Sequence, residues 1–134
     1  MLGASETGFM ATVLYVDDED AIRRAVAAWL TRRGHTVHTA GTLAEARDLI
    51  ASQAIDGAFI DIWLGEESGL ELHDWIDENC PALSPKIVFV TGDMGASEII
   101  RCSLGKLGRP VLAKPFELQQ LDTFVHLWIN RTPA

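Results

Sequence analysis

The chain has 134 residues, a formal net charge of −8 and 48% hydrophobic residues, and its isoelectric point is about 4.8. This length predicts one globular domain with a buried core. The acidic balance argues against a surface that binds nucleic acid or anionic membranes, because either partner would need a basic face. No stretch approaches the roughly 20 apolar residues that span a bilayer, and the first residues lack a signal peptide's features. We therefore expect a cytoplasmic protein.

Strand-like apolar runs alternate five times with segments of helical periodicity. The predicted strands cover residues 12–16, 35–39, 55–60, 86–90 and 110–113. The predicted helices cover 19–33, a segment that a capping box opens at 42–45, a segment between Ser68 and Pro81, 96–106, and 118–129. Five such units predict an α/β fold: a parallel sheet of strand order 2-1-3-4-5 with helices on both faces, as in flavodoxin-like proteins.

One domain accounts for nearly the whole chain. We assign it residues 12–130, with 1–11 as an N-terminal extension and 131–134 as a C-terminal tail. No output domain is expected within these residues.

Polar residues follow four of the predicted strands where each runs out into a loop. They are Asp17 and Asp18, then Asp61, Thr91 and Lys114. Because the carboxyl ends of parallel strands open onto one crevice, we expect these side chains to converge. Three adjacent carboxylates need a compensating cation, and their hard oxygens suit Mg²⁺.

The same residue types can carry phosphoryl chemistry. A carboxylate can act as a nucleophile and become an aspartyl phosphate, and the Lys114 ammonium suits a phosphate. Thr91 offers a hydroxyl, and Gly92 leaves a backbone N–H open to a phosphate oxygen. Pro115 fits a tight turn, and a cis bond before it would aim Lys114 inward. Each feature alone is common in loops, but their combination at successive strand ends favours a functional site.

Four stretches of this chain resemble the receiver domain of bacterial two-component response regulators. They are VLYVDDED (13–20), AFIDIWLGEESGLEL (58–72), IVFVTGD (87–93) and VLAKPF (111–116), within a resemblance that runs from about Thr12 to Asn130. Gly69, eight residues after Asp61, also falls where the family places a glycine.

The resemblance implies a role for each site residue. Asp61 would be the phosphoacceptor, with Mg²⁺ as cofactor. Asp18 would bind the metal directly, Asp17 mainly through water, and the backbone carbonyl of Trp63 would complete the protein's ligands. Thr91, Lys114 and the backbone of Gly92 and Trp63 would contact the phosphoryl group.

The family's partners follow from the same resemblance. The phosphoryl donor would be a phosphohistidine on a histidine kinase or a histidine phosphotransfer protein. The output would be an unidentified protein partner or onward phosphotransfer, without nucleic acid or membrane, and a homodimer is an open alternative. The domain would be a signalling module rather than an enzyme, catalysing only its own phosphorylation and dephosphorylation.

Some positions depart from the family's pattern. Val111 stands where many receivers carry a Phe or Tyr whose rotation reports phosphorylation, and valine is stiff at χ1. We therefore expect Thr91 to move while the signal leaves through the loop and helix at 92–107. Gly65 replaces a frequent proline, which predicts a more mobile loop. Trp63 and Asp93 are expected to tune the lifetime of the aspartyl phosphate, with loop packing as the simpler role for Trp63.

Alternative functions remain open from the sequence. A degenerate receiver would act as a protein-interaction module without being phosphorylated. An aspartate-nucleophile phosphatase would resemble Asp-x-Asp at its nucleophile, whereas this chain has Asp61-Ile62-Trp63. A flavin-binding module would be repelled by the acidic loop after the first strand.

Other polar residues receive structural interpretations. His73 and His126 are expected to pack or lie at the surface, and His35 and His38 belong to a strand with no evident carboxylate partner. The arginines of the first helix, which include Arg23, predict a solvated face, with kinase docking as the sharper alternative.

Overall fold

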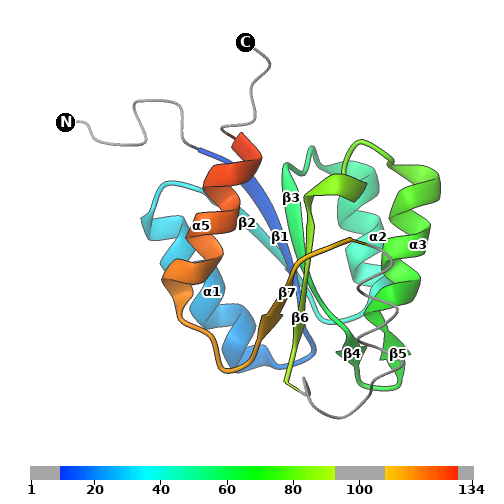
Figure 1. Ribbon diagram of the computed structural model, residues 1–134, viewed down its shortest axis with the longest axis horizontal. Coiled ribbons are helices and arrows are strands. Elements are labelled where there is room, and N and C mark those ends of the chain that lie inside the picture. Colours follow the sequence, from blue (N-terminus) through cyan, green and yellow to red (C-terminus); the bar gives the residue numbers. More distant parts are fainter. Residues whose placement is uncertain (1–9, 93–107, 130–134) are drawn as a thin grey trace.

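The fold is built on a five-stranded parallel sheet (Figure 1). The computed structural model describes residues 10–92 and 108–129. The sheet has the order β2-β1-β3-β6-β7, which confirms the predicted order of its five strands. Their bounds are β1 Thr12–Val16, β2 Thr36–Ala40, β3 Gly57–Asp61, β6 Ile87–Thr91 and β7 Val111–Ala113.

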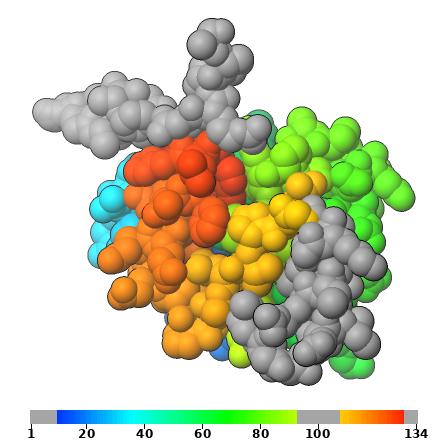
Figure 2. Space-filling model, in the orientation of Figure 1, coloured from blue at the N-terminus to red at the C-terminus, as the bar shows by residue number. Residues whose placement is uncertain are grey.

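Helices cover both faces of the sheet, as the alternating pattern predicted (Figure 1). One face carries α1 (Asp20–Arg32) and α5 (Leu118–Ile129), and the other carries α2 (Leu43–Ser52) and α3 (Gly69–Asn79). A short 3-10 helix, η2 (Ser84–Lys86), precedes β6. The predicted helix at 96–106 lies outside the described residues. In the space-filling view, α5 and the segment that follows β7 form much of the visible face (Figure 2).

Successive side chains of a strand point to opposite faces of the sheet. Because helices cover both faces, the side chains on either side are buried. In β1, Leu14 and Val16 enter the core under α2 and α3. Val13 and Tyr15 enter the core under α1 and α5. Burial on both faces explains why the strands read as continuous apolar runs instead of alternating ones.

The expected capping box at the start of α2 is present with one change of partner. The Thr42 hydroxyl accepts from the backbone N–H of Glu45 at 3.1 Å. The Glu45 carboxylate reaches back to the N–H of Gly41 at 2.7 Å, one residue before the cap. The Thr42 side chain therefore satisfies one of the backbone donors that the first turn of a helix leaves open, and the Glu45 side chain satisfies a donor just before the helix.

Two details of the chain path differ from the sequence prediction. Asp61 and Thr91 are the last residues of β3 and β6, not the first residues of the loops that follow. The loop after β3 also contains a two-stranded antiparallel ladder, β4 (Trp63–Leu64) with β5 (Glu67–Ser68). Gly65 lies in its turn with φ +62°, a conformation closed to proline, whose ring holds φ near −65°.

The expectation that His35 lacks a carboxylate partner is wrong. Its Nε2 lies 3.1 Å from Asp122 Oδ1, and Asp122 Oδ2 accepts from Arg33 at 2.9 Å. His35 Nδ1 accepts the backbone N–H of Ala11 at 3.1 Å, so the ring proton lies on Nε2 and faces the carboxylate. This buried network joins the end of α1 to α5 at the amino edge of the sheet.

None of the helices in the described ranges combines the length and the apolar character that crossing a membrane requires.

Gly57→Ala tests how closely α5 packs on the sheet. A Cβ at Gly57 would lie 2.2 Å from Cε3 of Trp128, a buried residue whose ring is 4.9 Å from that of Phe59. We expect a loss of roughly 1–3 kcal/mol in the free energy of unfolding, as is usual for an overpacked core. Urea denaturation measures it.

The matched control is Gly41→Ala, whose added Cβ would meet the flexible end of the Arg23 side chain at 2.9 Å. Equal stability of the two variants would contradict the packing described for Gly57.

Candidate functional site

Strand register brings the sequence-predicted residues to one edge of the sheet. Val16 pairs with Ile60, so Asp17, which directly follows β1, lies beside Asp61, the last residue of β3. On the next pair, Thr91 is opposite Ala113, so Lys114 leaves β7 beside the end of β6. This carboxyl edge faces the lower part of the view, where β4 and β5 lie (Figure 1).

Asp17, Asp18 and Asp61 form the acidic cluster. Each offers a carboxylate oxygen, and the three oxygens lie within 4.8 Å of one another. Asp17 and Asp61 are buried, at 0% and 4% exposure, whereas Asp18 is exposed. Since divalent cations such as Mg²⁺ prefer hard oxygen ligands, the cluster could hold a metal ion.

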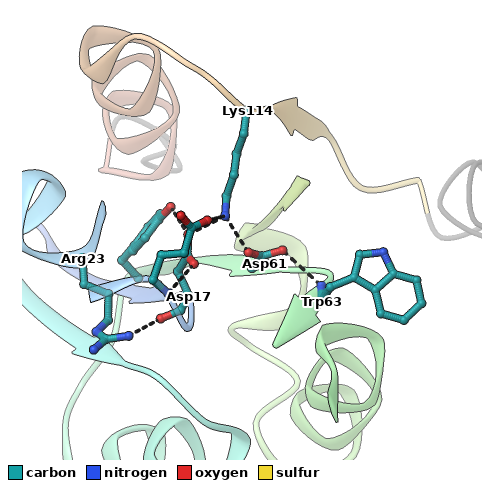
Figure 3. Close-up of polar contacts among 7 residues, drawn as sticks. Asp17, Arg23, Asp61, Trp63 and Lys114 are labelled. Carbon is teal, nitrogen blue, oxygen red and sulfur yellow. Dashed lines mark hydrogen bonds and ion pairs between the residues drawn. The ribbon is translucent and has the colours of Figure 1, made fainter. Parts of the chain in front are cut away.

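The Lys114 ammonium lies between the Asp17 and Asp61 carboxylates (Figure 3). Its Nζ is 2.7 Å from Asp61 Oδ2, 2.9 Å from Asp17 Oδ2 and 3.0 Å from Glu19 Oε1. The Lys114–Pro115 peptide bond is cis. Burial acts to lower the pKa of Lys114, but its hydrogen bonds to Asp61, Asp17 and Glu19 outweigh burial and raise the pKa above its usual value. The lysine therefore stays charged.

The Asp61 carboxylate accepts hydrogen bonds in the site, but its negative charge is only partly compensated. Its Oδ1 accepts the backbone N–H of Trp63 at 3.0 Å. Burial raises the pKa of Asp61 above its usual value; Lys114 and the Trp63 N–H oppose this shift, and the charge of Asp17 adds to it. One ammonium shared among several carboxylates thus leaves the site short of positive charge.

Asp17 is fixed by donors on every side. Its Oδ2 accepts from the Tyr15 hydroxyl at 2.9 Å, and its Oδ1 accepts from the Glu19 backbone N–H at 3.0 Å. The Arg23 guanidinium donates to the Asp17 backbone carbonyl at 2.6 Å (Figure 3). Burial and the neighbouring Asp17 raise the pKa of Tyr15 well above its usual value, so its hydroxyl remains a donor.

Sequence analysis missed both Tyr15 and Arg23 as site residues. The sequence pattern indicates only that Tyr15 belongs to a buried strand and that Arg23 belongs to a solvated helix face. The Arg23 side chain is only 21% exposed, and it also pairs with Asp20 at 3.1 Å. The spacing of these residues in the sequence does not predict either contact with Asp17, because both contacts depend on how the chain turns after β1.

An open cleft of about 400 Å³ lies over the acidic cluster. The Trp63 side chain is 47% exposed at its rim, and in Figure 3 its indole points away from Lys114. The residues that line the cleft are Asp18, Glu19, Asp61, Trp63, Gly65, Gly92 and Lys114.

The remaining predicted residues are placed as follows. Thr91 is buried at the end of β6, and Val111 packs half-buried against the core under α2 and α3. Asp93 lies outside the described residues. The phosphate contacts of Thr91 and Gly92, the metal contact of the Trp63 carbonyl and the tuning roles stay predictions.

Gly69 is required by a close backbone approach. A Cβ at this position would lie 2.1 Å from the Asp61 carbonyl oxygen, and the Gly69 N–H donates to the Ile62 carbonyl at 2.7 Å. Glycine thus lets α3 begin directly against the backbone that carries Asp61.

Comparison with known families decides what this chain is. Residues 13–126 match the response regulator receiver domain family. The chain belongs to that family. Receiver domains are signalling modules of two-component systems, and the motifs at the strand ends of this receiver are the ones that carried the resemblance in its sequence.

Relatives of this receiver include transcriptional regulators and a sensor kinase. It is 33% identical over 123 residues to the alginate biosynthesis transcriptional regulatory protein AlgB of Pseudomonas putida, covering 82% of this chain and 27% of AlgB. It is 34% identical over 127 residues to the sensor kinase CckA of Brucella abortus, covering 91% of this chain and 13% of CckA. The chain thus spans only a small part of each relative.

A solved relative has the same fold. It is a response regulator of Burkholderia pseudomallei with a phosphorylated aspartic acid, a calcium ion and citrate. The TM-score is 0.74 at 28% identity, covering 86% of this chain and 66% of that one.

Asp61→Asn tests the charge imbalance of the receiver without metal. The raised pKa of Asp61 means that folding favours its protonated carboxyl. Asp61 therefore stabilises the fold at low pH, and this contribution is lost as the pH rises through the pKa of the folded state. In EDTA at neutral pH, we expect Asp61→Asn to unfold at a higher urea concentration than the parent. The gap should close as pH falls and the parent's Asp61 takes up a proton.

Asp74→Asn is the charge-matched control, because it removes one carboxylate at a side chain that is 78% exposed. If Asp61→Asn were less stable than the parent at neutral pH, the result would contradict the charge imbalance, because it would show that Lys114 fully compensates the negative charge of Asp61.

Proposed function

We propose that this receiver takes a phosphoryl group onto Asp61 from the phosphohistidine of a histidine kinase or a histidine phosphotransfer protein, with Mg²⁺ as cofactor. The observation that carries the proposal is the 2.7 Å contact between Lys114 Nζ and Asp61 Oδ2 beside the acidic cluster. The phosphorylated aspartic acid of the Burkholderia relative supports it.

The transfer follows from the chemistry of the side chains. An Asp61 carboxylate oxygen attacks phosphorus, the phosphorus–nitrogen bond to the donor imidazole breaks, and the neutral imidazole leaves after taking a proton. Mg²⁺, held by Asp17, Asp18, Asp61 and the Trp63 carbonyl, would supply the positive charge that the site lacks.

Lys114 would exchange its contacts during this transfer. In the described structure it pairs with Asp61, Asp17 and Glu19. On phosphorylation, its charge would stabilise the phosphoryl oxygens, to which the Thr91 hydroxyl and the Gly92 N–H would also donate. The added charge of roughly −1.5 to −2 would thereby bias the conformations of the segments that carry Thr91 and Lys114.

The output of the switch would be a contact with a protein partner or onward phosphotransfer in the cytoplasm. AlgB is named as a transcriptional regulator and CckA as a sensor kinase. Either setting suits this receiver, because the acidic cluster and Lys114 all come from one domain.

Incubation with acetyl phosphate and Mg²⁺ tests phosphorylation directly. We expect intact-mass spectrometry to find a gain of one phosphoryl group in the parent, lost in Asp61→Asn and restricted to the peptide that contains Asp61. EDTA should abolish the gain, and Asp18→Asn should reduce it strongly.

Two results would contradict the proposal. An unlabelled parent that also fails to bind beryllofluoride would favour a degenerate receiver. Continuous release of phosphate from a generic phosphate ester would favour a phosphatase.

Trp63→Ala tests whether the indole at the cleft rim protects the aspartyl phosphate. We expect the phosphorylated variant to lose phosphate several times faster than the parent, because water would reach Asp61 more freely. The decay of the phosphorylated mass over time measures it. Trp63→Phe, which keeps an aromatic ring, should decay at an intermediate rate, and equal rates for all three proteins would leave Trp63 a packing role only.

A further inference from the structure

We propose that Tyr15 is a positioning residue for the metal site: its hydroxyl holds the Asp17 carboxylate in the orientation that the acidic cluster needs to bind a divalent cation. This inference rests on the Mg²⁺ site of the proposed function and adds a residue beneath it, in the core of the protein.

The first step is the hydrogen bond itself. Tyr15 lies in β1 and Asp17 directly follows this strand; both residues are buried, with 0% exposure. The Tyr15 hydroxyl donates to Asp17 Oδ2 at 2.9 Å. A buried hydroxyl loses its hydration and is costly unless it finds a partner, and a carboxylate is the strongest acceptor that a phenol can meet in a protein.

The second step concerns the hydroxyl as distinct from the ring. Tyr15 is the only tyrosine in the chain. Its ring packs near Phe59 at 6.3 Å and Phe116 at 6.5 Å, in the hydrophobic core under α1 and α5. Phenylalanine would fill the same volume there. Packing thus accounts for an aromatic ring at this position, and among the described residues the contact with Asp17 accounts for its oxygen.

The third step is that Tyr15 is a fixed donor, whereas Lys114 is not. Asp17 Oδ2 also contacts Lys114 Nζ at 2.9 Å, but that ammonium is shared with Asp61 and Glu19 and sits on a flexible stem. When Lys114 turns toward a phosphoryl group, Oδ2 keeps the hydroxyl of Tyr15. The rigid strand and the packed ring therefore maintain the orientation of Asp17.

Hydrogen-bond partners behind metal ligands usually matter for affinity. Their loss typically weakens metal binding by 10- to 100-fold, because the ligand is no longer pre-oriented. Asp17 retains the Glu19 N–H on Oδ1 and the Arg23 guanidinium on its backbone carbonyl. The loss expected from removing the Tyr15 hydroxyl alone is therefore at the lower end, about 10-fold.

Calorimetric titration of the unphosphorylated protein with Mg²⁺ tests the inference. We expect the Kd of Tyr15→Phe to rise about 10-fold over the parent. Phe116→Leu is the packing control: it removes the ring that contacts Tyr15 but keeps the hydroxyl, so it should lower the urea midpoint and leave the Kd unchanged. If the role of Tyr15 were purely structural, Tyr15→Phe would change the urea midpoint and leave the Kd for Mg²⁺ unaltered.

The outcomes separate this inference from the proposed function. Equal Mg²⁺ affinity of the parent and Tyr15→Phe overturns the role of Tyr15 and leaves the phosphoacceptor proposal standing. A parent that binds no Mg²⁺ overturns both the role of Tyr15 and the cofactor of the proposed function.

A second measurement covers the case in which Tyr15→Phe does not fold. Because the chain has one tyrosine, the parent labelled with 3-fluorotyrosine gives a single fluorine NMR signal from this position. We expect that signal to shift during Mg²⁺ titration with the calorimetric midpoint, and Asp17→Asn to abolish the shift. A signal that stays unmoved at saturating Mg²⁺, or that moves equally in Asp17→Asn, overturns the inference.

Discussion

One ammonium placed among several carboxylates is the interaction on which this receiver depends. Lys114 contacts Asp61, Asp17 and Glu19 within 3.0 Å, while Asp18 adds a further carboxylate to the cluster. The lysine keeps its charge, yet burial still raises the pKa of Asp61. The site is therefore organised but short of positive charge, and that shortage is the physical reason why the cluster could hold a divalent cation.

The packed strands and helices of the fold hold these like charges close together despite their repulsion. Parallel register sets Asp17 beside Asp61, and Gly69 lets α3 begin against the Asp61 carbonyl. Tyr15 and Arg23 hold Asp17 from the core and from α1. Two cores, one on each side of the sheet, resist the repulsion that would otherwise spread the strand ends apart.

This arrangement fits a switch better than an enzyme with turnover. The side chain two residues after Asp61 is the half-exposed indole of Trp63, which cannot serve as a general acid for hydrolysis. Val111 is partly buried and packs against the core under α2 and α3.

Sequence alone predicted the sheet topology, which the structure confirms, and the set Asp17, Asp18, Asp61, Thr91 and Lys114 as site candidates, because periodicity and strand-end positions are local properties of a parallel α/β chain. It placed Asp61 and Thr91 just outside their strands and missed the ladder of β4 and β5, since short pairings leave little periodicity to detect. Only the tertiary structure decided that His35 meets Asp122 across 87 residues, and that Tyr15 and Arg23 hold Asp17. Such contacts depend on side-chain directions that are fixed only once helices pack on the sheet.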